Sequence, residues 1–278
     1  MVEYLKNPDI WAMIGLGILV VLITRGLLIN GLEKLAEATR MRTKTRGQIM
    51  GYATSTPELV GTVSTAYHGL LGAGLWNVAA SNIINLGLFI AAAVRYRRTK
   101  AVIRRKFLDE MGFAFGAIVL PVLLVWKGEW AASPWAALGL FVYFGAYLIL
   151  DPLFNPAPSE DDDEKEPTDW RLASVGIGLL LLGILGIVFT GNALGTVADR
   201  VVNALGIPEM AIGWILGVIT SLPELTTFFS VFSKGKRDED DADDADVQQN
   251  LDNLAASNMS NVGLIYPIGI AVFLIFAV

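Results

Sequence analysis

The stretch TSTPELVG, from Thr54 to Gly61, places a proline and a glutamate inside a long apolar segment. Further along the chain, TSLPELTT, from Thr220 to Thr227, repeats the Thr, Ser, Pro, Glu and Leu of that stretch in register. A carboxylate in an apolar span is costly unless it meets a cation, a proton or a water-filled cavity. Two such units in one chain therefore indicate a shared polar centre.

The composition is that of an integral membrane protein. Of the 278 residues, 54% are hydrophobic and only 17% are charged. Apolar runs long enough to cross a bilayer as helices, about 20 residues each, lie near 10–31, 47–67, 72–94, 107–126, 135–150, 172–191, 208–232 and 253–278. We therefore predict an all-α membrane fold of roughly eight spans. The first run is expected to remain as a span, because its flank is acidic and polar rather than basic.

The scarcity of metal-binding side chains narrows the function. The absence of cysteine excludes disulfides and thiolate metal sites, and a single histidine, His68, excludes a multi-histidine centre. We place His68 at an interfacial helix end. No nucleophile set or cofactor loop is recognisable, so we expect no enzyme, no bound cofactor and no nucleic-acid partner.

The basic residues predict the orientation in the membrane. Alternate loops hold most of them, above all 34–46 and 95–106, and the other loops hold few. By the positive-inside rule the basic loops are cytoplasmic, which places both termini outside the cell membrane. Arg25, in the first span, is expected to snorkel to the cytoplasmic interface.

A charged linker divides the chain into two related halves. Residues 155–170 are acidic and proline-containing, typical of a solvated cytoplasmic linker, and they separate a first half, 1–154, from a second, 171–278. When the halves are aligned, Gly47 lies over Gly213, Gly51 over Gly217, and NVAASNIIN (Asn77 to Asn85) over NLAASNMSN (Asn253 to Asn261). An odd number of spans precedes the second copy. That copy therefore enters the membrane upside down, as in the inverted repeats of secondary transporters.

The two copies differ in length. The second carries an extra acidic cytoplasmic loop, 234–249, which lacks the mid-loop glycine and bidentate glutamate of an EF-hand. We interpret it as a solvated charge run, with a low-affinity cation collector as the alternative. Counterparts of the fourth and fifth spans are missing from the second half. Either a homo-oligomeric partner covers the exposed flank, or the core is stable without one.

Each repeated unit combines oxygen ligands for a hard cation. Pro57 removes a backbone donor and opens the helix, which frees carbonyl oxygens near Gly51 and Ala53, and Pro223 does the same near Gly217 and Ile219. Carboxylate, hydroxyl and carbonyl oxygens together suit Na⁺ or Ca²⁺. The side chains expected to line the site are Glu58, Glu224, Ser55, Ser221, Thr54, Thr220, Ser81, Ser257, Asn85 and Asn261.

The charge and spacing of these residues favour one site shared by both copies. The two glutamates match the charge of one Ca²⁺, and the neutral oxygens could hold several Na⁺ instead. Asn82 and Asn258 point about a quarter-turn away and are expected to hydrogen-bond between helices. The alternative is that all of these polar residues merely hold membrane helices together.

These units resemble the α-1 and α-2 repeats of the sodium/calcium exchanger family. TSTPEL with SNIIN, and TSLPEL with SNMSN, carry the resemblance, which covers spans one to three and six to eight. It implies Na⁺-driven Ca²⁺ countertransport by alternating access, with the side chains named above lining the cation sites. It also implies that spans one and six slide against the core, on a surface kept smooth by Gly176, Gly178, Gly183 and Gly186.

Departures from the family pattern refine the expectation. Asn261 stands where many relatives have aspartate, which makes K⁺ co-transport less expected, and TSxPE in place of GNxxE favours Na⁺ over H⁺ coupling. AASN replaces the usual GSN and adds a methyl at a close helix crossing. The alternatives are a Ca²⁺/H⁺ or other cation/proton antiporter, a cation channel, and a truncated homologue without transport.

Overall fold

The computed structural model describes residues 7–104, 107–154, 168–234 and 240–276, and the elements in these ranges are helical. In chain order they are α1 (Pro8–Ile23), π-helix η2 (Thr24–Ile29), α2 (Asn30–Ala38), α3 (Thr43–Thr54), α4 (Thr56–Tyr67), α5 (Leu71–Arg95), α6 (Thr99–Val102), α7 (Leu108–Trp126), 3-10 helix η4 (Gly128–Ala132), α8 (Pro134–Phe154), α9 (Trp170–Leu205), α10 (Glu209–Thr220), α11 (Leu222–Lys234), α12 (Asp240–Ser260), π-helix η5 (Asn261–Ile265) and α13 (Tyr266–Phe276). The predicted all-α class is confirmed.

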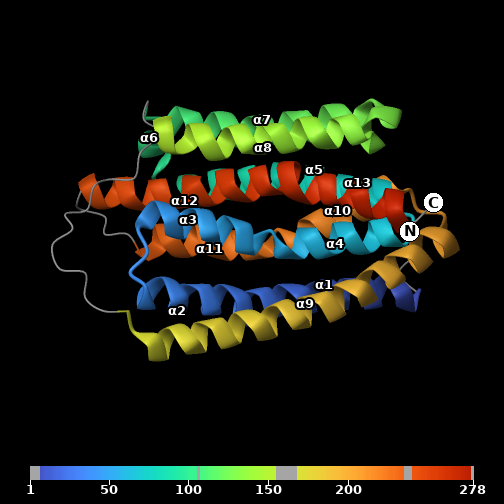
Figure 1. Cartoon of the computed structure of the whole chain (residues 1–278), viewed down its shortest axis with the longest axis horizontal. Coiled ribbons are helices and arrows are strands. Elements are labelled where there is room, and N and C mark those ends of the chain that lie inside the picture. Colours follow the sequence, from blue (N-terminus) through green and yellow to red (C-terminus); the bar gives the residue numbers. More distant parts are fainter. Residues whose placement is uncertain (1–6, 105–106, 155–167, 235–239, 277–278) are drawn as a thin grey trace.

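The helices combine into long rods that run along one axis (Figure 1). Within the described ranges, seven segments are long and apolar enough to cross a membrane: Pro8–Ala38, Leu71–Arg95, Leu108–Trp126, Pro134–Leu153, Trp170–Leu205, Glu209–Ser233 and Ala245–Phe276. The α3–α4 rod is not among these seven segments, because it carries the polar residues Lys44, Arg46 and Gln48 in its first half, but it runs alongside them in the bundle. Each predicted span thus corresponds to a helical rod, with wider bounds at several ends.

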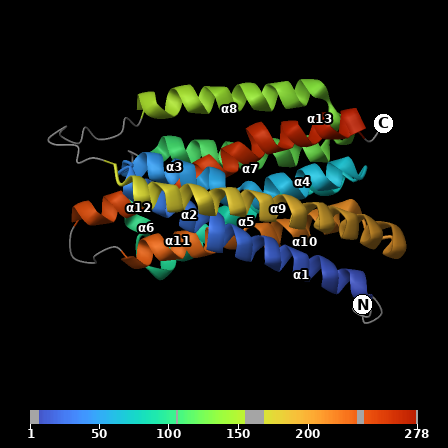
Figure 2. The same cartoon turned by 60° about the horizontal axis from the view of Figure 1, so that its bottom comes forward.

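The rods form three layers. In Figure 1, α7 and α8 cover one side of the bundle, α1, α2 and α9 cover the other, and the repeat helices α3, α4, α5 and α10 to α13 lie between them. Figure 2 shows the same arrangement after rotation, with α8 at one edge and α1 at the opposite edge. Both chain termini lie at one end of the bundle, here called the terminal end. The opposite end holds α6 and the basic segments 34–46 and 95–104, and is called the basic end.

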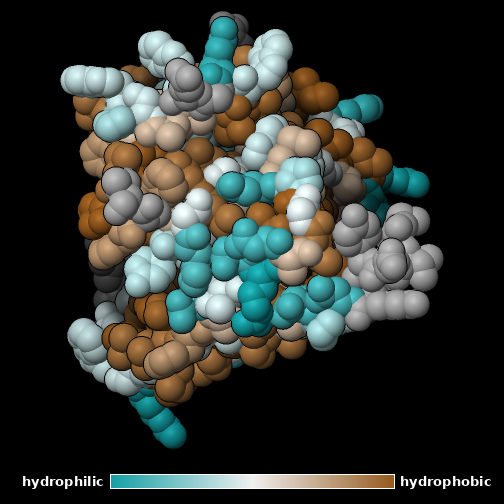
Figure 3. Space-filling view, turned by 90° about the vertical axis from the view of Figure 1, so that its right-hand side faces the viewer, coloured by the Kyte–Doolittle hydropathy of each residue, from teal (hydrophilic) through white to brown (hydrophobic). Residues whose placement is uncertain are grey.

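The surface is that of a protein embedded in lipid. Large apolar side chains are exposed along α9, where Leu181 is 59% and Phe189 is 76% exposed. Figure 3 looks onto the terminal end, where hydrophilic residues gather near the middle and hydrophobic residues surround them. Exposed apolar sides with a polar end face are expected when the sides contact hydrocarbon and the ends contact water.

Local sequence signals set several helix ends. Asn7 caps α1 by accepting a hydrogen bond from the Asp9 amide at 2.8 Å, with Pro8 at the first helical position. Asp169 caps α9 by accepting from the amides of Arg171 and Leu172 at 3.0 and 3.1 Å. Gly206, with φ of 59°, ends α9 in the left-handed conformation that glycine adopts without strain.

The acidic segment 240–249 is helical, so the predicted loop 234–249 is wrong over that part. Its aspartates lie near the N-terminus of α12, where the helix dipole favours negative charge. Val247 and Leu251 anchor this turn in the core, at 0% and 1% exposure. The rest of the predicted loop, 235–239, and linker residues 155–167 lie outside the described residues.

The first helix of each interrupted rod packs against the rod of the other copy that carries the AASN motif. Thus α3 contacts α12, and α10 contacts α5. A Cβ built on Gly51 of α3 would lie 2.9 Å from the Ala256 methyl of α12, and one on Gly217 of α10 would lie 2.8 Å from the Ala80 methyl of α5. Glycine is therefore required at both crossings, because a side chain would push the helices apart. The extra methyl of each AASN motif thus faces a glycine of the other copy.

Glycines in the first half of α9 face the rod α1–η2–α2 and not the core. Gly176 lies against the backbone of Gly31, Gly183 against Leu28, and Gly186 against Ile23. A Cβ built on Gly178 would meet nothing within 4 Å. The expectation that these residues smooth a surface toward the core is therefore wrong. Gly176, Gly183 and Gly186 instead let spans one and six pack closely against each other.

Candidate cation-binding site

Each TSxPE unit interrupts a transmembrane rod, as predicted. α3 ends at Thr54 and α4 begins at Thr56, and α10 ends at Thr220 and α11 begins at Leu222. Pro57 and Pro223 lack the N–H that the carbonyls of Ala53 and Ile219 would accept in a continuous helix. The Gly51 carbonyl, in contrast, accepts hydrogen bonds from the hydroxyls of Thr54 and Ser55, at 3.1 and 3.0 Å. The carbonyls of Ala53 and Ile219 thus lose their usual i+4 donor, although the amides of Ser55 and Ser221 at the breaks still approach them. The carbonyls of Gly51 and Gly217 remain engaged by the same two amides.

Glu58 and Glu224 begin the second half of each broken rod and are completely buried. The two carboxylates are close enough to interact electrostatically. Neither oxygen of Glu58 has a hydrogen-bond partner, and neither does Oε2 of Glu224. Two buried acids with unpartnered oxygens are unfavourable alone, so the arrangement favours a cation between them.

A chain of hydroxyls connects Glu224 to the first copy. Ser257 of α12 donates to Oε1 of Glu224 at 3.0 Å. The same Ser257 oxygen lies 2.9 Å from that of Ser55, and accepts from the Asn85 amide at 3.2 Å. Thr54 also lies beside the Glu224 carboxylate. Residues from both copies thus surround one acid.

The mirror half of the site is arranged around Asn77. Thr220 donates to Oδ1 of Asn77 at 3.2 Å, and the Asn77 amide lies 3.4 Å from the Glu58 carbonyl and from the Thr62 hydroxyl. Asn261 donates to Ser81 at 3.3 Å. The sequence does not predict Thr62 as part of the site. Phe228 occupies its aligned position in the second copy, so the repeat gives no signal there.

All ten side chains predicted to line the site are at most 2% exposed. Besides the glutamates, unpartnered oxygens belong to Asn85 (Oδ1), Ser221 (Oγ) and Asn261 (Oδ1). These carboxylate, amide and hydroxyl oxygens are of the type that hard cations prefer. The described residues therefore bring together a donor-poor, acceptor-rich centre inside the bundle.

Asn82 and Asn258 bond between helices, as expected. Each amide donates to the backbone carbonyl of the other, at 3.2 and 3.3 Å, and Asn82 also donates to Ala117 of α7 at 2.8 Å. Asn82 further accepts from Asn261 at 2.8 Å. This pair ties α5 to α12 and α7 and fixes the helices that present the site.

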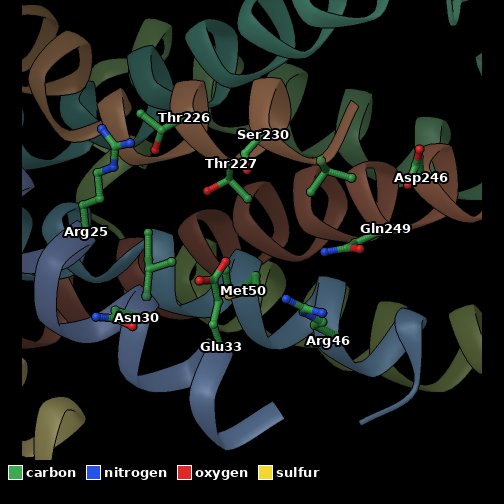
Figure 4. Close-up of a pocket in the computed structure, with 12 residues that line it drawn as sticks. Arg25, Asn30, Glu33, Arg46, Met50, Thr226, Thr227, Ser230, Asp246 and Gln249 are labelled. Atoms are coloured by element: carbon green, nitrogen blue, oxygen red, sulfur yellow. The ribbon is translucent and has the colours of Figure 1, made fainter. Parts of the chain in front are cut away.

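A cavity of about 340 Å³ lies beside the site toward the basic end (Figure 4). It separates η2 and α2 from α3, α11 and α12, and its lining includes Arg25, Glu33, Met50, Thr226 and Thr227. Thr227 lies about one helical turn after Glu224. Arg25, an exposed residue, projects toward Thr226 at the edge of this cavity in Figure 4.

On the terminal side of the site, α1 and α9 pack closely against the core helices. A Cβ on Gly191 or Gly195 of α9 would overlap the side chains of Val60 and Ser64 on α4. On the opposite face, a Cβ on Gly17 of α1 would lie 2.6 Å from Ile219 of α10. The rods α1 and α9 therefore contact the core closely at the terminal half and leave a cavity at the basic half.

The sequence also matches a known protein family over most of its length. The sequence profile described as sodium/calcium exchanger protein matches residues 10–151 and 175–276. The chain belongs to the sodium/calcium exchanger family. Both repeats of this family member, with Glu58 and Glu224, lie within the matched segments.

Solved structures of a sodium-calcium exchanger, NCX_Mj, share the fold of this exchanger-family chain. The form soaked with 2.5 mM Na⁺ and 10 mM Sr²⁺ is 21% identical, with a TM-score of 0.52, and the match covers 94% of this chain and 81% of that one. The form soaked with zero Na⁺ and Ca²⁺ is 21% identical, with a TM-score of 0.51 and coverage of 98% and 83%. No curated protein sequence matches this exchanger-family chain.

Proposed function

We propose that this chain is a secondary antiporter that exchanges Na⁺ for Ca²⁺ across the cell membrane by alternating access. The observation that carries the proposal is the pair of buried glutamates, one from each copy, whose unpartnered oxygens share one centre. Such a pair supplies two negative charges, which one Ca²⁺ neutralises. Membership of the exchanger family supports the same reading.

The neutral ligands supply the sites for Na⁺. The unpartnered side-chain oxygens of Asn85, Ser221 and Asn261 supplement those of the glutamates. We propose that the carbonyls of Ala53 and Ile219, which lack an i+4 N–H donor, contribute as well. Sodium ions carry half the charge of Ca²⁺, so several of them can occupy separate oxygens when Ca²⁺ leaves. Exclusive occupancy by one kind of ion is the condition for exchange.

The open and closed halves correspond to one state of the alternating-access cycle. We assign the cavity as the route of ions from the basic end, and we assign the close contacts of Gly191 and Gly195 with α4 as the closure of the terminal end. We assign the basic end to the cytoplasm by the positive-inside rule, so this state faces inward. The outward state requires the rod α1–η2–α2 and α9 to move together, because Gly176 and Gly183 of α9 pack against Gly31 of α2 and Leu28 of η2.

Transport in liposomes tests the proposal. Purified protein should take up ⁴⁵Ca²⁺ when the vesicles are loaded with Na⁺ and diluted into Na⁺-free medium, and uptake should collapse when a sodium ionophore dissipates the gradient. Glu58→Gln and Glu224→Gln should abolish uptake, whereas Glu33→Gln, at the cavity wall, should retain it. Equal uptake under a pH gradient would identify a proton-coupled exchanger, and gradient-independent flux would identify a channel.

The pseudo-symmetry also supports a partner for one face of α5. Gly263 of η5 lies directly against Phe144 and Leu140 of α8. At its aligned position, Gly87 of α5, an added Cβ would meet nothing within 4 Å, and Ile90 and Val94 beside it are 50% and 60% exposed. We propose that a second copy covers this face, with Gly87 and Ala91 spaced as small residues are in close membrane-helix pairs.

A further inference from the structure

The basic end holds a second group of acids that the exchange site does not use. Asp109 and Glu110 lie in the first turn of α7, Asp151 lies near the end of α8, and Asp252 lies on α12. Glu110, Asp151 and Asp252 are only 1%, 2% and 1% exposed. Asp151 pairs with Lys44 at 2.9 Å, but several buried carboxylates so close together remain unfavourable unless further positive charge joins them.

Three of these carboxylates converge on one point. Asp109, Glu110 and Asp151 each offer an oxygen, and the three oxygens all lie within 4.8 Å of one another. Oxygens on opposite sides of a Ca²⁺ ion are separated by about twice its ligand distance, or roughly 4.6 to 5.2 Å. The three oxygens are therefore close enough together to contact a single ion.

Some of the carboxylate oxygens in this group have no hydrogen-bond partner. Asp151 places Oδ2 against Lys44 and Gln48, both at 2.9 Å, but its buried Oδ1 has no hydrogen-bond partner. Asp252 accepts from Gln248 at 3.0 Å through Oδ1, and its buried Oδ2 is unpartnered as well. The same Gln248 amide reaches Glu110 at 2.9 Å, which links Asp252 to the converging group.

Helix packing does not account for these polar residues. In the aligned copy, Trp76 takes the place of Asp252, Met210 that of Lys44, and Trp214 that of Gln48. Gly47 contacts Asp252 just as Gly213 contacts Trp76, so the crossing tolerates an apolar residue there. Asp252, Lys44 and Gln48 thus have no polar counterparts at the symmetry-related crossing, which points to a role beyond helix packing. Asp109, Glu110 and Asp151 belong to α7 and α8, which have no counterparts in the second half.

An entry path exists. A cavity of about 200 Å³ lies at the same end, lined by Lys44, Gln48, Tyr147 and Asp151 among others. Asp109 is itself partly exposed, so water and ions reach the group from the basic end. A roomy, polar approach is one of the requirements of a genuine metal site.

We propose that Asp109, Glu110 and Asp151 form a second binding site for a divalent oxygen-preferring cation such as Ca²⁺, with Asp252 as supporting charge. The site clamps the basic ends of α7 and α8 to α12, the helix that carries Ser257 and Asn261 of the exchange site. Its formation does not depend on the exchange site or on the proposed transport function.

The test is Ca²⁺ binding to a chain whose exchange site has been disabled. Full-length Glu58→Gln/Glu224→Gln protein in detergent is titrated with ⁴⁵Ca²⁺ by equilibrium dialysis, and we expect one ion per chain and a rise in melting temperature on adding Ca²⁺. Adding Asp151→Asn should weaken this binding at least about tenfold. Adding Asp199→Asn, which removes an acid on α9, is the control and should leave binding unchanged.

Asp151 also pairs with Lys44, so its loss could unfold the chain. Asp109→Asn, at the partly exposed rim, is therefore measured in parallel, with gel filtration as the check on folding, and the same loss of affinity is expected. Absence of Ca²⁺ binding in the Glu58→Gln/Glu224→Gln protein, or binding unaffected by Asp109→Asn, would overturn the proposal. Either result would leave Na⁺-driven uptake by the wild type intact, so the two proposals fail independently.

Discussion

The hydroxyl oxygens of Ser55 and Ser257 lie 2.9 Å apart although 202 positions separate the two residues. Ser55 is the break in the first copy's interrupted rod, and Ser257 belongs to the last rod of the second copy. Ser257 continues the contact to Glu224 at 3.0 Å. The inverted repeat therefore builds one site out of two copies, and neither copy holds a complete set of ligands.

Removal of the Ser257 hydroxyl should weaken Ca²⁺ binding without unfolding the protein. Ser257→Ala deletes a hydrogen bond to a carboxylate and a junction with Ser55 and Asn85, a loss of about 1.5 kcal/mol or roughly tenfold in affinity. Isothermal titration with Ca²⁺ measures it. Ser260→Ala is the control, because the Ser260 hydroxyl bonds only to the carbonyl of Ser257 among its described contacts. Equal affinity in the two variants would show that the Ser257 hydroxyl is no ligand.

The asymmetry between the two halves predicts different accessibilities. The natural chain has no cysteine, so Thr226→Cys and Ser64→Cys each provide a single thiol. Thr226 lines the cavity, whereas Ser64 is buried against Gly195. A charged thiol reagent should therefore label Thr226→Cys several-fold faster in ion-free protein. Faster labelling of Ser64→Cys would mean that the terminal half is the open one.

Much of this architecture can be predicted from the sequence, because it depends on local chemistry. Pro57 and Pro223 must break a helix wherever they fall within it, and the break appears at Ser55 and Ser221. Gly51 and Gly217 aligned because each meets an alanine methyl of the other copy. Because the two repeated patterns align with each other, the polar residues that they share predict the lining of the polar centre.

The sequence does not predict structural features that are formed by residues far apart in the chain and outside the repeated patterns. Asp252 lies one position before the repeated Asn253 face, and its acidic neighbours come from α7 and α8. The helical start of α12 also lacks a signal in the sequence, because its charge conceals the anchoring contacts of Val247 and Leu251.

The amide pair of Asn82 and Asn258 should matter for stability more than for ion selectivity. Asn82→Leu leaves the carbonyls of Asn258 and Ala117 without their donor inside the membrane, a cost of about 1 to 2 kcal/mol. We expect a melting temperature lowered by several degrees and an unchanged preference for Ca²⁺ over Mg²⁺. Asn192→Leu, at an exposed position of α9, serves as the comparison. A changed selectivity with normal stability would place Asn82 among the ligands instead.

The open face of α5 should be the contact between two copies. With a two-fold axis along the membrane normal, Ala91 of one copy would meet Ala91 of the other. Ala91→Cys is thus expected to form a disulfide-linked dimer in native membranes under mild oxidation, seen as a doubled mass on a non-reducing gel. Leu182→Cys, on the exposed side of α9, should remain monomeric. Dimers that form equally from both variants would indicate random collision and contradict the proposed interface.

The position of a divalent ion tests the central claim most directly. Crystals soaked in Sr²⁺, whose anomalous scattering distinguishes it from water and Na⁺, should show a peak within about 2.6 Å of carboxylate oxygens of both Glu58 and Glu224, given typical ligand distances for ions of this class. That peak should disappear in Glu58→Gln crystals soaked identically. Sr²⁺ held by one glutamate alone, or no peak between the two, would contradict a cation site shared by the inverted copies.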